Sequence, residues 1–526
     1  MFDVEEKKKE LRSNYGENKE ITGDYDESLA AKCVNGTFVG LKKNNIIEYK
    51  GIPFVAEPPI GDNRWKAPIE YKEDDRVYEA YYNAKSAYQA ENFSESASLY
   101  YKSEDCLYLN IWKNDDDIKD KPVMVWIHGG AFEMGGTIDP MHDCYNFIEE
   151  NPDVIMVTIA YRLAAFGFFH LSHLEDGADY PDAQNLGLLD QRVALKWIKE
   201  NIASFGGDPS NITIFGESAG AASVSLLPLI DGAKDCFNKV IVQSGSPVFT
   251  RSVEQSIQCT NEIMEILNCK TVADLKKIPE EELAETYRIL GLRVWPERDG
   301  KLLPLDPYEV YANGGCNDKI FLQGCNKDEV AYFVFCFGGP GQFTPWGVNR
   351  KEMKLAQLTD DEKELLEKFY ENAEGEQYEK LRKLFDQIVF TAPMIRLSEN
   401  IANAGGKSYS YYFRVESSVP LMLSGHAVEL STVFKHPEIN GATGREFDET
   451  FSKTLRKMWV QFAKTGNPSL EASEAPNGKD NIWPLYDSKD KNVMVFDEFD
   501  IHVDKESNLN IVDWDNTYFL TKYYCI

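Results

Sequence analysis

The chain has 526 residues, of which 43% are hydrophobic and 12% aromatic, and its formal net charge is −30. This apolar content excludes a largely disordered chain, and so strong a negative charge disfavours binding to nucleic acids or to anionic membranes. The opening residues are charged rather than apolar, and no run of about 18 apolar residues follows. We therefore expect neither a secretory signal nor a membrane span.

The N-terminal part of the chain changes character near residue 30. Residues 1–30 are dense in charge and poor in large apolar groups, and we expect them to form a charged arm. Residues 33–41 and 45–54 alternate apolar and polar positions, which predicts antiparallel strands. Because no internal repeat and no linker rich in Gly, Pro or Ser follows, we predict one large domain over residues 31–526.

Short apolar runs rich in β-branched and aromatic residues come next, at residues 107–112, 123–130, 153–162 and 211–218. Such runs are typical of buried strands in a mostly parallel sheet. Residues 188–206 repeat apolar positions three to five apart, which predicts an amphipathic helix that ends at Gly206. Strands alternating with helices predict an α/β fold with a large, mostly parallel central sheet and helices on both faces.

Helical patterns continue in the second half of the chain. Residues 270–300 and 350–385 are strongly charged, and we interpret them as surface helices or as insertions that cap a site. A further amphipathic helix is predicted to end at Gly466.

The clearest chemical motif is Gly216-Glu217-Ser218-Ala219-Gly220, which lies between a predicted strand and a segment of small residues. Glycines on either side of the serine let a strand turn sharply into a helix, so that the hydroxyl is held out at the carboxyl end of the strand. The same turn directs the Ala219 N–H and the helix N-terminus toward an anion that forms there. We therefore predict that Ser218 is a nucleophile and that Ala219 is an oxyanion donor.

A second glycine-rich turn, HGGAF at residues 128–132, follows another predicted strand. Glycines let backbone N–H groups face a ligand without side chains in the way. We predict that Gly130 and Ala131 supply the other oxyanion donors. The candidate substrate contacts are Gly129 and Phe132, which flank these two donors, and Glu217, which precedes the serine.

A serine hydroxyl is a poor nucleophile unless a base takes its proton. With a GxSxG turn the acid and then the histidine follow the serine in chain order, which leaves His426, His436 and His502. His426 lies in a glycine-flanked loop before an apolar segment and is the leading candidate. We interpret His436, just before a proline, as a surface loop residue and His502 as part of a strand.

The acid that orients the histidine should lie at the carboxyl end of a strand. Asp328 and Glu329 both follow the apolar run at 319–324 and both fit that position. The residue pattern does not choose between them.

An alternative role for His170 and His173, which lie near Glu175 and Asp176 in the sequence, is to bind a metal ion. Their spacing is loose, and we interpret this segment as a polar surface turn. None of the ten cysteines forms a CxxC pair, which argues against a zinc ribbon. We predict neither a metal nor a cofactor.

Several of these segments together resemble the type-B carboxylesterases, the family of cholinesterases, liver carboxylesterases and bacterial para-nitrobenzyl esterases. Residues 205–220 are similar to the nucleophile signature of that family, and residues 104–112 to its second signature. The resemblance runs from about residue 30 to residue 526 and includes residues 49–68, 185–202, 464–468 and 483–487.

The resemblance implies an α/β-hydrolase fold with helical insertions over the active site. It assigns the acid to Glu329, in Lys327-Asp328-Glu329, and the base to His426, in the segment 426–430. The implied reaction is ester hydrolysis, in which Ser218 is acylated as the alcohol leaves and water then cleaves the acyl-enzyme. Small to medium, neutral or cationic small-molecule esters are the expected substrates.

Secreted members of the family pair the cysteine of the second signature, here Cys106, with one upstream. No cysteine lies between Cys33 and Cys106, so we expect reduced thiols and a cytoplasmic, bacterial protein. The alternative hypothesis is a binding module, because the family also contains non-catalytic adhesion proteins that lose the serine or the histidine. A lipase, a thioesterase or an amidase would use the same triad, and the oligomeric state stays open.

Overall fold

The computed structural model describes residues 15–90, 101–290, 295–336, 339, 360–436 and 442–509. The chain divides into two compact units. The first comprises Met1–Lys239 and Thr250–Asp306, and the second comprises Val240–Phe249 and Pro307–Ile526. Each unit contains parallel strand pairs, as the predicted α/β class requires.

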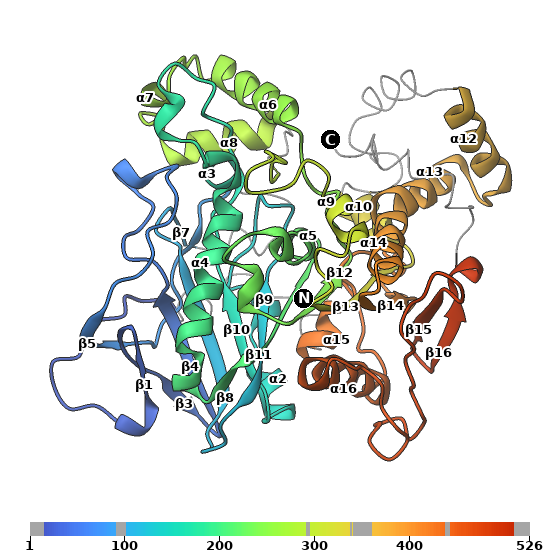
Figure 1. Ribbon diagram of the computed structural model, residues 1–526, viewed down its shortest axis with the longest axis horizontal. Coiled ribbons are helices and arrows are strands. Elements are labelled where there is room, and N and C mark those ends of the chain that lie inside the picture. The colour runs from blue at the N-terminus through green and yellow to red at the C-terminus, as the bar shows by residue number, and fades with distance from the viewer. Residues whose placement is uncertain are drawn as a thin grey trace. The chain divides into compact units, whose positions relative to one another are not determined.

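In its described part the first unit holds a mixed sheet with the strand order β3-β4-β8-β10-β9-β11 (Figure 1). β9 pairs in parallel with β10 and β11, whereas the remaining pairs are antiparallel. The four apolar runs that predicted buried strands are β8, β9, β10 and β11, so this prediction is confirmed. The bounds are β3 Leu41–Lys43, β4 Ile46–Pro53, β8 Tyr108–Asn114, β9 Lys121–Ile127, β10 Ile155–Ile159 and β11 Gly207–Glu217.

The predicted amphipathic helix is confirmed as α4, Leu186–Asn201, which continues as a 3₁₀ turn over Ile202–Phe205. Its apolar side chains, such as Leu189 and Trp197, are buried, and it packs against β11. The helix stops where predicted because Gly206 takes a left-handed conformation, with φ of 89°, that costs glycine little.

A smaller sheet forms near the start of the chain from β1 (Ala30–Cys33), β2 (Asn35–Val39) and β5 (Asp74–Glu79). The described part of the predicted arm is tied to β5 by backbone hydrogen bonds. The Ile21 N–H donates to the Val77 carbonyl at 2.8 Å, and the Glu79 N–H donates to the Lys19 carbonyl at 2.9 Å. The first 14 residues of the arm lie outside the described residues.

Where it is described, the second unit orders its strands as β12-β13-β14-β15-β16. β14 pairs in parallel with β13 and β15, and β16 adds an antiparallel edge. An aromatic core fills this unit, where the Trp459 ring lies 5.4 Å from Tyr411 and 5.7 Å from Phe496. The bounds are β12 Lys239–Gln243, β13 Ile320–Asn326, β14 Lys407–Phe413, β15 Asn492–Asp497 and β16 Asp500–Lys505.

Helices cover both strand sets. The first unit has α2 Tyr145–Glu150, α3 Ala164–Gly167, α5 Ala219–Leu226, α6 Val253–Ile266, α7 Val272–Leu275 and α8 Glu280–Leu290. The second has α9 Pro307–Ala312, α10 Glu329–Cys336, α12 Asp360–Asn372, α13 Gln377–Phe385, α14 Ala392–Asn403, α15 Leu430–Phe434 and α16 Glu449–Thr465.

The charged helical stretches are confirmed where they are described, as α7 and α8 in one unit and α12 and α13 in the other. Residues 291–294 and 350–359 of these stretches lie outside the described residues. The predicted helix that ends at Gly466 is confirmed as α16. Within the described ranges no helix combines the length and the apolar character that crossing a membrane requires.

A buried ion pair fastens the segment after β10 to α4. Arg162 is 2% exposed and Asp190 is 0% exposed, and two guanidinium nitrogens donate to the carboxylate at 2.7 and 2.8 Å. The Arg162 N–H also donates to Asp190, at 3.0 Å. One carboxylate therefore accepts from the backbone N–H and from two side-chain nitrogens of Arg162.

We expect Asp190→Asn to lower the free energy of unfolding by about 3–5 kcal/mol, because it leaves the Arg162 charge buried without its counter-ion. Urea unfolding monitored by tryptophan fluorescence measures this. Asp231→Asn is the matched control, because Asp231 pairs with Lys234 at 2.6 Å on the surface, and exposed pairs of this kind contribute little to stability. Equal losses in the two variants would contradict the prediction.

Candidate active site

Ser218 is the single residue between β11, which ends at Glu217, and α5, which begins at Ala219. Its φ of 58° and ψ of −122° fall in a region that a residue with a side chain rarely adopts. The Ser218 carbonyl already accepts a helical hydrogen bond, from the Ala222 N–H at 2.9 Å. This is the strand-to-helix turn that the GxSxG spacing predicts, and it holds the half-buried serine at the carboxyl end of β11.

The two glycines of the motif allow three backbones to meet at this turn. A Cβ on Gly216 would lie 2.5 Å from the Gly220 carbonyl carbon and 2.7 Å from the Ile127 carbonyl oxygen. A Cβ on Gly220 would overlap the same Ile127 carbonyl at the end of β9. Any larger residue would therefore push α5 away from the end of β9.

The HGGAF loop follows β9 and passes beside the serine. A Cβ placed on Gly129 would lie 3.1 Å from the Ser218 Cβ. The next three residues, Gly130, Ala131 and Phe132, have φ of 101°, 57° and 62°. A run of positive φ values at two residues that carry side chains is costly, and such strain is concentrated at functional sites.

Buried aromatic groups support this loop. The Phe132 ring is 0% exposed and lies edge-on to Phe168 at 5.0 Å, so it packs in the protein interior. The Tyr161 hydroxyl donates to the His128 carbonyl at 2.8 Å, and the two rings stack at 4.4 Å. Burial lowers the pKa of His128 to about 4, so this ring is neutral near pH 7.

The second unit brings His426 and Glu329 together. The His426 Nδ1 lies 2.5 Å from the Glu329 Oε2, and the His426 N–H donates to the Glu329 carbonyl at 3.1 Å. The two side chains are 5% and 0% exposed. Because a carboxylate can only accept, this contact places the proton of the neutral ring on Nδ1 and makes Nε2 the acceptor.

Asn326, the last residue of β13, holds this pair in place. Its N–H donates to the Glu329 Oε1 at 2.7 Å, and its side-chain amide donates to the Gly425 carbonyl and to Glu429, both at 2.8 Å. The residue therefore joins the acid to the loop that carries His426. Asn326 was not among the residues predicted from the sequence, where its only signal is its place at the end of a strand just before Lys327.

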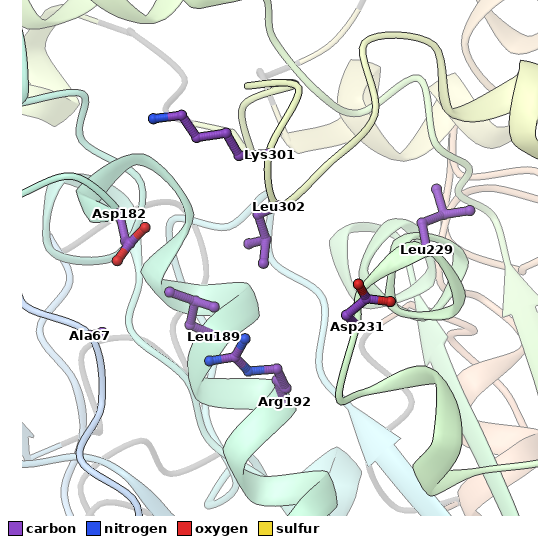
Figure 2. Close-up of a pocket in the computed structure, with 8 residues that line it drawn as sticks. All are labelled: Ala67, Asp182, Leu189, Arg192, Leu229, Asp231, Lys301 and Leu302. Atoms are coloured by element: carbon purple, nitrogen blue, oxygen red, sulfur yellow. The ribbon is translucent and has the colours of Figure 1, made fainter.

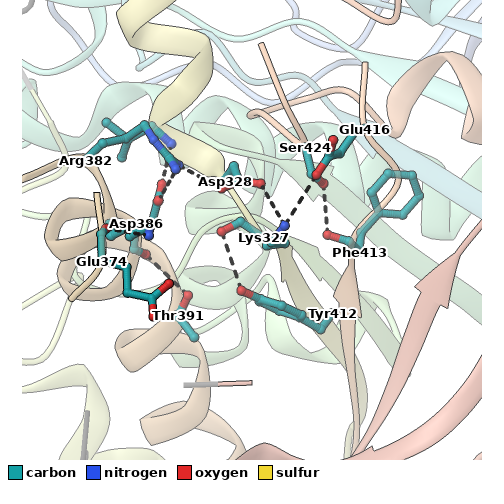
Figure 3. Close-up of polar contacts among 12 residues, drawn as sticks. Lys327, Asp328, Glu374, Arg382, Asp386, Thr391, Tyr412, Phe413, Glu416 and Ser424 are labelled. Carbon is teal, nitrogen blue, oxygen red and sulfur yellow. Dashed lines mark hydrogen bonds and ion pairs between the residues drawn. The ribbon is translucent and has the colours of Figure 1, made fainter. Parts of the chain in front are cut away.

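Asp328, the other acid candidate, faces a different partner (Figure 3). Arg382 donates to Asp328 at 2.9 Å and to Asp386 at 2.8 Å. Asp386 in turn accepts the Val330 N–H at 2.7 Å. The residues just before and just after Glu329 are thus both anchored to one buried ion network, and Glu329 alone of the two candidates contacts His426.

Aromatic rings surround the imidazole on its other sides. The Phe390 and Phe333 ring centroids lie 5.0 and 5.3 Å from that of His426, and that of Tyr332 lies 6.0 Å away. Phe390 belongs to a short π-helix over Asp386–Thr391, a form that is frequent at functional sites. These rings offer an apolar wall to a group bound beside His426.

The other histidines are placed as follows. The surface interpretation of His436 is wrong, because this side chain is buried, with 6% exposure. His502 lies on β16 as predicted and contacts Asp500 at 3.0 Å. The polar surface turn at 170–173 is wrong for His170, which is buried, while Ser172 and His173 are exposed.

No group of three or more His, Cys, Asp or Glu in the described ranges could hold a metal ion. A pocket of about 310 Å³ lies elsewhere in the first unit, with side chains from α4 and from the loop at 301–302 (Figure 2). Its lining combines acidic, basic and apolar groups and contains none of the predicted site residues. The residues that line it are Ala67, Asp182, Leu189, Arg192, Leu229, Asp231, Lys301 and Leu302.

These features define a class of protein, the serine hydrolases of the α/β-hydrolase fold. The carboxylesterase EST55 of Geobacillus stearothermophilus superimposes with a TM-score of 0.79 at 32% identity, covering 91% of this chain and 98% of the other. A para-nitrobenzyl esterase structure gives a TM-score of 0.80 at 30% identity, with 92% and 98% covered.

Sequence comparison agrees with the structural comparison. Residues 28–511 match the carboxylesterase family. The para-nitrobenzyl esterase of Bacillus subtilis is 35% identical over 504 residues, which cover 90% of this chain and 96% of the relative. The mouse cholinesterase is 30% identical, with 88% and 81% covered. The chain belongs to the carboxylesterase family and is a carboxylic-ester hydrolase, which confirms the resemblance stated from the motifs.

The buried network beside Glu329 should make stability depend on pH. Burial raises the pKa of Asp386 to about 8, although Arg382 opposes the shift. Between its ordinary pKa and this value the folded protein binds a proton that the unfolded chain releases, so stability falls as the pH rises. From about pH 5 to about pH 8 the wild type should lose up to about 1.4 kcal/mol per pH unit relative to Asp386→Asn.

Urea unfolding of both proteins across this range measures the difference. Asp231→Asn is the control, since a hydrogen bond from Lys234 lowers the pKa of this exposed carboxyl and its titration lies below the range. A difference between wild type and Asp386→Asn that does not change with pH would contradict the prediction.

Proposed function

We propose that Ser218, His426 and Glu329 form the catalytic triad of this carboxylesterase. The observation that carries the proposal is the buried contact of 2.5 Å between His426 Nδ1 and Glu329. It fixes the tautomer whose Nε2 can take a proton from a serine hydroxyl, which is what a general base must do. The strained turn at Ser218 and the chain order of the three residues support the same assignment.

The oxyanion hole in this proposal consists of three backbone N–H groups, from Gly130, Ala131 and Ala219. The first two lie in the loop that passes beside the serine, and the third opens α5 directly after it. Such donors stabilise the negative oxygen of the tetrahedral intermediate, which is often the largest single contribution to acyl transfer. Gly129 and Glu217, which lie next to these groups, would contact the substrate.

In the proposed reaction the Ser218 Oγ attacks the ester carbonyl carbon while His426 Nε2 takes the hydroxyl proton. Glu329 stabilises the imidazolium, which then protonates the departing alcohol and leaves the acyl group on Ser218. Water attacks the acyl-enzyme with His426 again as base, and the acid is released. Every proton moves between the Ser218 Oγ, water, the substrate and the Nε2 atom, which returns a proton to Ser218 as the acid leaves, so the sequence of steps needs no cofactor.

The proposed substrates are small to medium esters that are neutral or cationic. The formal charge of −30 disfavours anionic substrates. The rings of Phe333 and Phe390 beside His426 provide apolar contacts for the ester. The name of the para-nitrobenzyl esterase relative points to benzyl esters as one group to test.

We also propose that the protein works in the reducing cytoplasm of a bacterium. The nine cysteines in the described ranges are free thiols, and eight of them are buried. Burial raises the pKa of several of them, Cys33, Cys106 and Cys144 among them, which keeps these groups protonated and unreactive.

Hydrolysis of p-nitrophenyl acetate, butyrate, octanoate and palmitate by the wild type and Ser218→Ala tests the nucleophile. We expect short-chain activity in the wild type and a loss in kcat on the order of 10⁵-fold in the variant. A folded variant with full activity would contradict the assignment of Ser218. A folded wild type that is inactive on all four esters and is not labelled by an organophosphate would favour a binding module instead.

Glu329→Gln and Asp328→Asn distinguish the two acid candidates, which are neighbours and both buried, with 0% and 6% exposure. Glu329→Gln should lower kcat by about 10⁴-fold, because an amide can hold the imidazole in the wrong tautomer. Asp328→Asn should stay within about tenfold of the wild type, because Asp328 contacts Arg382 and not His426. Thermal melting of both proteins checks that they fold, and the reverse pattern of activity would show that the acid is Asp328.

A further inference from the structure

A second serine, histidine and carboxylate lie in contact within the first unit, on residues that the proposed triad does not use. The His170 Nδ1 lies 2.7 Å from the Glu297 Oε2, and the His170 Nε2 lies 3.1 Å from the Ser172 Oγ. The order of contacts, from carboxylate to Nδ1 and from Nε2 to hydroxyl, is the order of a serine-hydrolase relay. The sequence analysis singled out His170 only as a weak metal candidate.

The acid end of this relay is buried and rigidly held. Glu297 is 1% exposed and His170 is 7% exposed. The Glu297 N–H donates to the Asn185 side-chain oxygen at 2.8 Å, and the Asn185 amide donates to the Glu297 carbonyl at 2.9 Å. Backbone bridging to Arg251 adds a further constraint. Glu297 is therefore positioned before any ligand binds, as an orienting carboxylate must be.

The carboxylate decides the tautomer of His170. A carboxylate oxygen accepts, so the proton of the neutral ring lies on Nδ1 and points at Glu297. Nε2 is then an acceptor, and the Ser172 hydroxyl donates to it. A hydroxyl that donates to an imidazole held by a carboxylate is prepared to lose its proton when its oxygen attacks an electrophile.

The hydroxyl end of the relay faces solvent. Ser172 is exposed, in a turn that the Leu174 N–H closes by donating to the Leu171 carbonyl at 3.0 Å. A solute can therefore reach the Ser172 oxygen while His170 and Glu297 stay sealed behind it. This combination of a buried relay and an exposed hydroxyl separates Ser172 from an ordinary surface serine.

Two other exposed serines show the difference. Ser28 and Ser210 each donate to an aspartate two positions earlier, Asp26 and Asp208, at 2.6 Å. They share with Ser172 the exposure and the spacing to the acceptor. Their acceptors are exposed or half-buried carboxylates, which are much weaker bases than an imidazole.

We propose that Ser172 is a second acyl-accepting hydroxyl, a site of covalent modification by activated carboxylic esters such as aryl acetates. The Ser172 Oγ attacks the ester carbonyl carbon as its proton passes to His170 Nε2. The bond to the aryl oxygen then breaks, and the imidazolium returns the proton to the departing phenol. The products are an acylated Ser172 and one phenol, and no other reactant is needed.

The reaction at Ser172 is stoichiometric rather than rapid turnover. Base catalysis contributes on the order of 10²–10⁴-fold, but at an exposed turn the oxyanion of the intermediate is solvated by water. A preorganised oxyanion hole is usually the larger contribution, so only esters with a good leaving group should react. The serine ester that forms has a poor leaving group, and it should accumulate on the protein.

The test uses full-length Ser218→Ala incubated with p-nitrophenyl acetate, followed by peptide mapping by mass spectrometry. We expect one acetyl group on the peptide that contains Ser172, formed on the order of 10²-fold faster than on Ser28 or Ser210. The same incubation of Ser172→Ala with Ser218→Ala should remove this label, and the exposed position makes loss of the fold a minor concern. Labelling of Ser172 no faster than of the two control serines would overturn the proposal.

A second variant tests whether the labelling of Ser172 depends on His170 and Glu297 or only on the exposure of the serine. Glu297→Gln in the Ser218→Ala background should slow the labelling of Ser172 at least about tenfold, and leave that of Ser28 and Ser210 unchanged. Thermal melting shows whether this variant is folded, and unchanged labelling of Ser172 in the folded variant would overturn the proposal. Ester turnover that survives in Ser218→Ala would count against the proposed triad, whereas the labelled peptide alone decides the role of Ser172.

Discussion

The arrangement around Ser218 in the first unit depends on one constraint. The chain must pass from β11 into α5 across a single residue. A strand and a helix run in different directions, so the residue between them takes backbone angles that its side chain resists, as the φ of 58° at Ser218 shows. The strain persists only because the surroundings leave no alternative. β9 runs in parallel beside β11, and its last carbonyl, from Ile127, fills the space that a Cβ on Gly216 or Gly220 would need. Backbone packing thus holds the serine outward.

In the second unit a residue of the predicted site also follows the end of a strand, but side chains rather than backbone packing hold it in place. β13 ends at Asn326 and α10 begins at Glu329, so the acid also follows a parallel strand directly. Here the position is fixed by polar groups in the core, with Asn326 on one side of the acid and the Asp386–Arg382–Asp328 network on the other. Buried polar groups are costly unless all are paired, so a network of this kind tolerates few arrangements. Because few arrangements are allowed, the Glu329 carboxylate is held in one position against His426.

The sequence analysis recovered the features that depend on local pattern. Period and composition located β8–β11 and α4, and the glycine spacing located the turn at Ser218, because each depends on residues near in sequence. The choice of Glu329 over Asp328 came from the resemblance, and the contacts with His426 and Arg382 show why the local pattern could not make it. Both acids follow the same strand, and their partners lie far along the chain. Asp386 lies one residue beyond the charged stretch at 350–385 and gave no signal of its own, and the burial of His436 and His170 depends on long-range packing of the same kind.

The pairing of His170 with Glu297 shows that a histidine oriented by a buried carboxylate does not by itself define an active site. What distinguishes Ser218 is the backbone around it: the loop of positive φ values at Gly130–Phe132 and the helix N-terminus at Ala219. These groups can stabilise an oxyanion, whereas the turn that carries Ser172 offers its hydroxyl to water. In the two proposals a histidine held by a carboxylate activates the serine in both cases, and the surrounding N–H groups make the difference between a catalyst that turns over and a residue that is modified once. In the proposed mechanism, rate enhancement therefore depends on the ends of β9 and β11 at least as much as on the three side chains of the proposed triad.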